Sequence, residues 1–105
     1  MPARIGAAEF DSEVLASPLP VLADFYSDSC IPCKRMSPIL SQLESEYADK
    51  IKLVKINTNF EKDLVARYEI MAAPTLILFR DGKEVSRIRG AVKKDEIIAL
   101  IDQNI

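Results

Sequence analysis

The segment "VLADFYSDSCIPCKRMSPIL", residues 21–40, decides the fold that we expect. Its first six residues are apolar except for Asp24, a pattern typical of a strand buried on both faces. Beyond residue 33 the apolar side chains recur at steps of three and four, as on one face of a helix: Met36, Ile39, Leu40, Leu43 and Tyr47. Pro38 lies within this stripe and is expected to kink the helix. The segment therefore predicts a strand, a turn with two cysteines, and a long helix.

The rest of the chain alternates between strand and helix patterns. "IKLVKIN", "TLILF" and "EVSRIR" predict strands, and Asp81-Gly82 between the last two is suited to a tight hairpin turn. Helices are expected around Phe10, after the capping-box spacing of Thr58 and Glu61, and at the end of the chain through Ile97, Ile98, Leu100 and Ile101. This order predicts an α/β sandwich around a mixed sheet.

Length and composition describe one ordinary globular domain, residues 1–105, with 49% hydrophobic and 29% charged residues. A net charge of −2 supplies no basic field for a nucleic-acid backbone. No apolar run is long enough to cross a membrane. We expect a cytoplasmic protein, and in that reducing compartment cysteine pairs are more often catalytic or metal-binding than permanent crosslinks.

Three roles are open to Cys30 and Cys33, the only cysteines. A structural zinc site needs four ligands, and with no histidine in the chain it would take carboxylates or a second chain to complete one. A structural disulfide would close so short a loop that it removes little entropy from the unfolded chain. The third role is a redox pair.

The position of the cysteines between a strand and a helix favours the redox role. Cys30 is expected to cap the helix, where free backbone N–H groups and the helix dipole stabilise a thiolate. Pro32 has no N–H and fits the first turn, so the partners of the Cys30 sulfur are the Cys33 amide and thiol. In this arrangement Cys30 attacks and Cys33, one turn further in, resolves.

These residues resemble the thioredoxin family. "VLADFYSDSCIPCKRMSPIL" is similar to its strand, cysteine motif and kinked helix, and "AAPT", "DGKEV" and "RGAVKKDEI" are similar to its later segments. The resemblance implies the thioredoxin fold, a three-layer sandwich with a mixed five-stranded sheet flanked by four helices. It also implies a monomer that reduces disulfides in partner proteins. No cofactor is implied beyond the redox-active Cys30–Cys33 disulfide, which a reductase of the thioredoxin-reductase type would restore to the dithiol.

Two charged residues have both a structural and a functional interpretation. Asp24 could be a polar residue reaching water at a strand end, or a buried carboxyl of raised pKa that takes the proton of Cys33. The resemblance implies the second role. Lys55 shares strand parity with Ile51 and Leu53, so its side chain could pair with Asp24 or extend to water.

The residues around Pro74 are the expected substrate groove. An X–Pro bond is usually trans, but the resemblance implies a cis Pro74 facing the dithiol. Ala73 would offer its backbone to an extended substrate peptide, and Gly90 would line the same groove. Gly90 could also be a plain turn at a strand end.

The chain departs from the family motif Trp-Cys-Gly-Pro-Cys at two positions, because Ser29 replaces tryptophan and Ile31 replaces glycine. Ile31 lies on the face where a partner docks, so we expect retained chemistry with altered partners, and a reductase adapted to this surface. Two alternatives remain: a thioredoxin-fold redox sensor or binding module without turnover, and a metal-bridged dimer.

Overall fold

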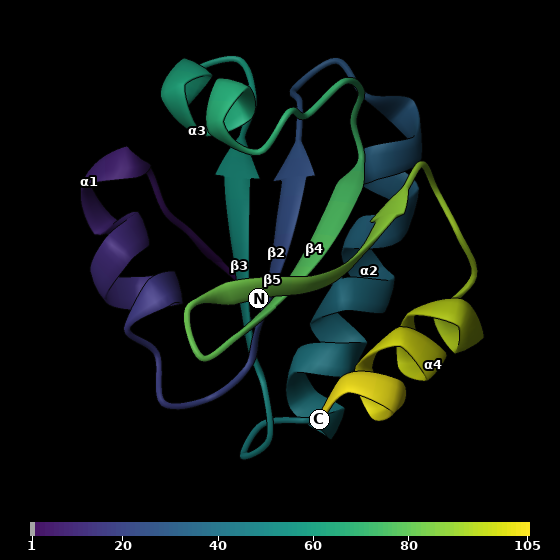
Figure 1. Ribbon diagram of the computed structural model, residues 1–105. Coiled ribbons are helices and arrows are strands. Elements are labelled where there is room, and N and C mark those ends of the chain that lie inside the picture. The colour runs from purple at the N-terminus through teal and green to yellow at the C-terminus, as the bar shows by residue number, and fades with distance from the viewer. Residues whose placement is uncertain (1) are drawn as a thin grey trace.

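The computed structural model describes residues 2–105 and contains a five-stranded mixed sheet between two helix layers (Figure 1). Its strand order is β1-β3-β2-β4-β5, with β1, β3 and β2 parallel and β4 and β5 each antiparallel to its neighbour. The elements are β1 Ala3–Arg4, α1 Ala7–Phe10, the π-helical turn η1 Asp11–Leu15, β2 Val21–Tyr26, α2 Ile31–Glu46, β3 Lys52–Asn57, α3 Lys62–Arg67, β4 Thr75–Arg80, β5 Lys83–Arg89 and α4 Lys94–Asn104. The predicted fold is confirmed. None of the helices in the described residues is long and apolar enough to cross a bilayer.

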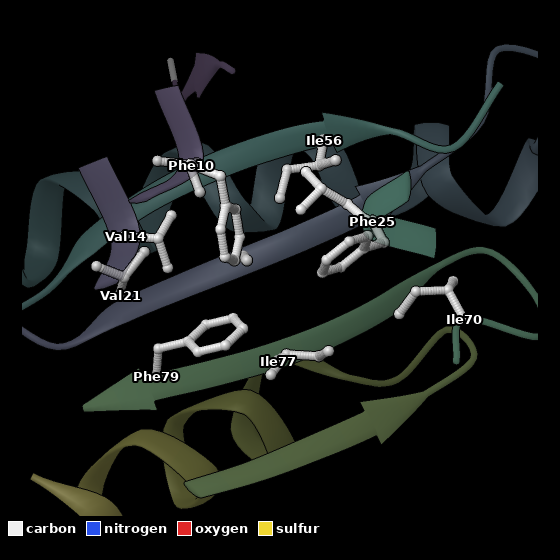
Figure 2. Packing of buried hydrophobic residues seen from close by; sticks show 11 residues of the cluster. Phe10, Val14, Val21, Phe25, Ile56, Ile70, Ile77 and Phe79 are labelled. Carbon is white, nitrogen blue, oxygen red and sulfur yellow. The ribbon is translucent and has the colours of Figure 1, made fainter. Parts of the chain in front are cut away.

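The sheet is covered on both faces, which requires two hydrophobic cores. One core packs α1, η1 and α3 against the sheet, and Figure 2 shows Phe10 and Phe79 meeting in it, with ring centroids 5.7 Å apart in an edge-to-face arrangement. The other core packs α2 and α4 against the opposite face through Leu22, Met36, Leu40, Leu43, Ile97 and others. Alternate residues of β2 enter alternate cores, so the strand is buried throughout.

The strand register gathers three segments at one end of the sheet. Phe25 pairs with Thr75, and Thr75 pairs with Arg89. The end of β2, the start of β4 and the end of β5 are therefore neighbours. The loop that leaves β2 runs directly into α2, which brings the cysteine segment to the same end of the sheet.

Two details of the secondary structure differ from the prediction or extend it. The capping-box prediction at Thr58 is wrong, because α3 begins at Lys62 after Glu61 and has no side-chain cap. The Glu61 carboxylate instead accepts the Ala7 N–H at 2.8 Å, and so serves the first helix. The two-residue strand β1 was not predicted from the hydrophobic pattern, because two residues carry no periodicity.

Two glycines with positive φ, Gly82 in the hairpin turn and Gly90 after β5, allow a test of how a side chain at each position affects stability. Gly82 has φ +78 and Gly90 has φ +88, so Gly82→Ala and Gly90→Ala each place a side chain in the left-handed region, at a cost of about 1–2 kcal/mol. An added Cβ at Gly82 lies 3.1 Å from the Leu15 carbonyl oxygen, whereas Gly90 has nothing within 4 Å. We expect urea unfolding to show Gly82→Ala as the less stable variant, by a further ~1 kcal/mol. Equal losses would mean that the contact with Leu15 relaxes without cost.

Candidate redox site

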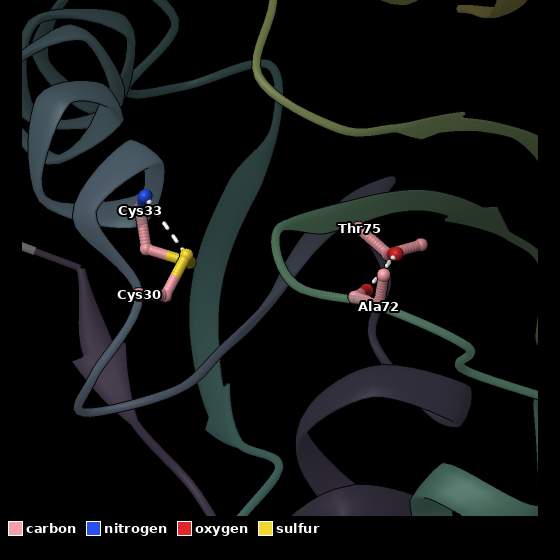
Figure 3. Close-up of a disulfide and its surroundings, with 4 residues drawn as sticks. All are labelled: Cys30, Cys33, Ala72 and Thr75. Atoms are coloured by element: carbon pink, nitrogen blue, oxygen red, sulfur yellow. Dashed lines mark hydrogen bonds between the residues drawn. A yellow bond between two sulfur atoms is a disulfide. The ribbon is translucent and has the colours of Figure 1, made fainter.

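Cys30 caps the N-terminus of α2, as the sequence predicts. Its backbone is extended, with φ −85 and ψ 107, and its Sγ accepts the Cys33 N–H at 3.1 Å (Figure 3). The two residues form a disulfide across a Cα–Cα distance of 5.2 Å. Pro32 occupies the first helical turn, where its missing N–H costs nothing.

The two sulfurs of this disulfide differ in their access to a partner. Cys30 is partly exposed at the end of the helix, whereas Cys33 is only 6% exposed. Ser29 and Ile31 flank Cys30 and are both exposed, Ile31 by 63%. A substrate that approaches along this surface therefore meets Cys30 first.

The Ala73–Pro74 peptide bond is cis, in agreement with what the resemblance implies. The Thr75 hydroxyl donates to the Ala72 carbonyl at 2.7 Å and holds this turn (Figure 3). The Pro74 carbonyl accepts the Gly90 N–H at 2.8 Å. Within residues 2–105, the backbone N–H and C=O of Ala73 have no hydrogen-bond partner, so this residue has a free donor and acceptor beside the cysteine end of the sheet.

Asp24 is buried on the α2 side of the sheet. It is 3% exposed, and its Oδ1 has no hydrogen-bond partner among the described residues. Burial raises the pKa of Asp24 to about 6, and the nearby positive charge of Lys55 opposes part of that rise. The interpretation of Asp24 as a polar residue reaching water is therefore wrong. A carboxyl with this pKa exchanges a proton readily near neutral pH.

Lys55 is the register partner of Asp24 but forms no ion pair with it in the described part of the chain. Its Nζ lies 4.6 Å from the centroid of the Tyr26 ring, and the residue is half-buried. The field of the ammonium group acts on Asp24 without direct contact.

The family model for thioredoxin matches residues 2–103. The chain belongs to the thioredoxin family. It is 41% identical over 96 residues to Thioredoxin C-2 of Corynebacterium nephridii, covering 91% of this chain and 89% of that protein. It is also 36% identical over 103 residues to Thioredoxin 1 of Synechococcus elongatus, covering 98% of this chain and 96% of that protein. Together with the Cys30–Cys33 disulfide, this membership makes the protein a thiol–disulfide oxidoreductase.

The relatives are not confined to bacteria. Thioredoxin X, chloroplastic, of Arabidopsis thaliana is 43% identical over 101 residues, a match that covers 94% of this chain and 56% of that longer protein.

In the described residues, no three His, Cys, Asp or Glu side chains gather closely enough to hold a metal ion.

Sequence reasoning missed several residues near the site of this thioredoxin-family protein. Met71 is 85% exposed two residues before Ala73, and nothing in its sequence pattern separates it from a loop residue. Arg4, Lys34 and Ser37 line a hollow beside Cys33. Arg4 reaches the hollow only through the unpredicted pairing of β1 with β3.

The burial of Asp24 predicts how stability depends on pH. Its pKa rises from 3.8 in the unfolded chain to about 6 when folded, so the native state binds the proton more tightly. Ionising Asp24 therefore destabilises the fold progressively between pH 4 and pH 6–7, by about 3 kcal/mol in total. Asp24→Asn should remove this loss.

Urea unfolding of the oxidised protein at pH 3.5 and pH 7.5 measures the effect. We expect the stability of Asp24→Asn relative to wild type to increase by about 3 kcal/mol between the two pH values. Asp49→Asn, at an exposed position in the turn between α2 and β3, controls for the loss of one negative charge. Parallel pH dependence of wild type and Asp24→Asn would contradict the raised pKa.

Proposed function

We propose that this thioredoxin-family protein reduces disulfides in partner proteins, with Cys30 as the nucleophile and Cys33 as the resolving thiol. The difference in exposure between the two cysteine residues carries this assignment. The Cys33 amide at 3.1 Å from Cys30 Sγ supports it, because a hydrogen bond to sulfur favours the thiolate over the thiol.

The reaction transfers two electrons from the dithiol to the substrate. The Cys30 thiolate attacks one sulfur of the substrate disulfide, forms a mixed disulfide, and releases the other substrate sulfur as a thiolate that takes up a proton. The Cys33 thiolate then attacks Cys30 Sγ. The second substrate sulfur leaves as a thiolate, which takes up a proton, and the Cys30–Cys33 disulfide forms.

Asp24 is the proposed acceptor of the Cys33 proton. Its carboxyl group lies on the sheet face that α2 covers, and its pKa of about 6 leaves it mostly ionised at pH 7. Because its Oδ1 has no partner in residues 2–105, it can take a proton without breaking a hydrogen bond. Lys55 supports this role by favouring the ionised carboxylate.

Substrate binding is proposed at the edge formed by Ala73, Pro74 and Gly90. The unpartnered backbone groups of Ala73 can pair with an extended peptide as an added strand. Pro74 is held by the Gly90 N–H, and Ile31 covers the adjoining surface next to Cys30. This arrangement aligns the substrate backbone while leaving its side chains to be selected by exposed residues.

The remaining properties are proposals from family membership. The redox disulfide itself carries the electrons, without a further cofactor. A reductase of the thioredoxin-reductase type restores the dithiol. We expect a monomeric single domain in a reducing compartment such as the cytoplasm, where the dithiol form persists.

Reduction of insulin by dithiothreitol tests the function. We expect the protein to accelerate this reaction and Cys30→Ser and Cys33→Ser each to lose at least about tenfold in rate. Cys30→Ser removes the attacking thiol, and in Cys33→Ser a thiol from solution replaces the far more effective intramolecular resolving thiol. Cys33→Ser should also accumulate a mixed disulfide with insulin, visible on a non-reducing gel, that Cys30→Ser does not form.

Other results would change the assignment. Equal trapping by both variants would contradict the division into attacker and resolver. A protein that forms the internal disulfide but does not accelerate insulin reduction would be a redox sensor or binding module. Metal analysis of protein purified without oxygen tests the metal-bridged dimer.

Ile31 is the proposed reason for an adapted reductase. Its branched side chain is 63% exposed beside Cys30, so it obstructs a reductase shaped for a glycine at this position. Ile31→Gly should lower the KM of a general bacterial thioredoxin reductase severalfold and leave dithiothreitol-driven insulin reduction within about twofold of wild type. Ile105→Gly, which removes an exposed isoleucine at the C-terminus, is the control. Equal KM values for wild type and Ile31→Gly would refute the idea.

A further inference from the structure

A row of charged side chains crosses three strands beneath the start of α2. Arg4 of β1 is the register partner of Lys55 of β3, which in turn is the partner of Asp24 of β2. Aligned residues of parallel strands project to the same face. Leu22 and Leu53, two positions before Asp24 and Lys55, pack in the core that includes α2, so the row lies on the α2 side.

A hollow of about 350 Å³ opens beside this row and reaches Cys33. Its lining includes Arg4 and Lys55 from the sheet, Lys34 and Ser37 from α2, and Tyr26. A second hollow, of about 460 Å³, is lined by Pro2 and again by Arg4, Ser37 and Lys55. Three cationic residues therefore line one space beside Cys33, together with the hydroxyl residues Ser27 and Ser37.

Among residues 2–105, the cations of this hollow lack carboxylate partners. Other cations of the described residues do form ion pairs: Lys52 with Glu13, Arg67 with Asp11, Arg87 with Glu84 and Lys94 with Glu46. No such pair involves Arg4, Lys34 or Lys55 within residues 2–105. Arg4 and Lys55 instead approach the Tyr26 ring, at 5.9 Å and 4.6 Å from its centroid.

Two carboxylates lie near the hollow but do not neutralise it. Asp28 lines its rim and accepts hydrogen bonds from the side-chain amides of Asn57 and Asn59. Asp24 is buried behind Lys55 and provides at most one further negative charge. Like charges side by side on neighbouring strands repel each other, and an anion bound between Arg4 and Lys55 would offset that repulsion.

We propose that Arg4 and Lys55, together with Lys34 and Ser37, bind an oxyanion, either a carboxylate or a phosphate group, beside Cys33. A guanidinium group can donate two parallel hydrogen bonds to such a group, and the ammonium and hydroxyl groups add further donors. The volume of the hollow falls in the range of small-ligand sites. The bound anion offsets the field of Lys55 and makes ionised Asp24 less favourable.

The oxyanion can come from two sources. It can be a free small anion, or the side-chain carboxylate of a protein substrate whose disulfide sits at Cys30. The chemistry of recognition is the same in both cases. The site does not depend on turnover, so binding by the oxidised protein is tested separately from the proposed reductase activity.

Titration of the oxidised full chain with inorganic phosphate, followed by NMR at constant ionic strength set with sodium chloride, tests the site. We expect saturable shifts of the backbone amides of Tyr26, Cys33 and Lys55. Arg4→Gln should weaken binding about tenfold, the size expected for loss of a charged hydrogen-bond donor. Arg35→Gln, an exposed arginine of α2 outside the hollow, should change affinity less than about twofold. Shifts that do not saturate, or equal weakening in both variants, would overturn the proposal.

The titration of Asp24 gives a second readout. Because Lys55 lowers the pKa of Asp24, a bound phosphate should raise that pKa in wild type and in Arg35→Gln, and less at the same concentration in Arg4→Gln. The side-chain carboxyl carbon of Asp24 reports this directly. An Asp24 titration unchanged by saturating phosphate would place the ion away from Lys55 and overturn the proposed site.

Two peptide disulfides that differ only in a glutamate or a glutamine near the cysteine distinguish the sources. A wild-type preference for the glutamate peptide that disappears in Arg4→Gln identifies a substrate carboxylate as the ligand. Phosphate binding without such a preference identifies a free anion. Both results support the site, whereas a preference for the glutamine peptide contradicts it.

Discussion

The six residues of β2 are buried on both faces at the centre of the sheet, and each side chain must therefore fit one of two closely packed cores. Four of them do so as apolar groups, Tyr26 is buried outside both clusters, and Asp24 is the charged exception. A carboxyl without a hydrogen bond at one of its oxygens is unfavourable there, so its presence requires a reason other than stability. The same strand leads through a short loop into the first turn of α2. The burial of Asp24 and the position of Cys30 at the start of that helix are therefore both set by β2.

The reactive end of the molecule results from register rather than from any single loop. The end of β2, the start of β4 and the end of β5 are paired in the sheet, so the cysteine turn, Pro74 and Gly90 are fixed relative to one another by backbone hydrogen bonds. The helix then supplies one amide to the Cys30 sulfur. A rigid scaffold with an exposed contact surface explains how partner recognition can change while the sulfur chemistry stays in place.

Most of the fold and the core of the site were predictable from local patterns, because strands of six residues and a 16-residue helix carry clear periodicity. The capping role of Cys30 followed from its place between two such elements. The interactions of Glu61 and Arg4 were not predictable, since each depends on a partner more than fifty positions away. The hydrophobic pattern places Asp24 inside a buried strand, but only the packed structure shows that Lys55 lies beside it and forms no ion pair within residues 2–105.

Ile31 is exposed whereas Cys33, two residues later, is buried, so the two positions tolerate substitution differently. Ile31 begins α2, yet its side chain belongs to neither core, and the exposed Met71 belongs to neither core as well. Codon changes at such positions alter the contact surface without disturbing the fold. Substitutions at these exposed positions can therefore change what the surface around Cys30 contacts, while the packing that holds the Cys30–Cys33 disulfide stays the same.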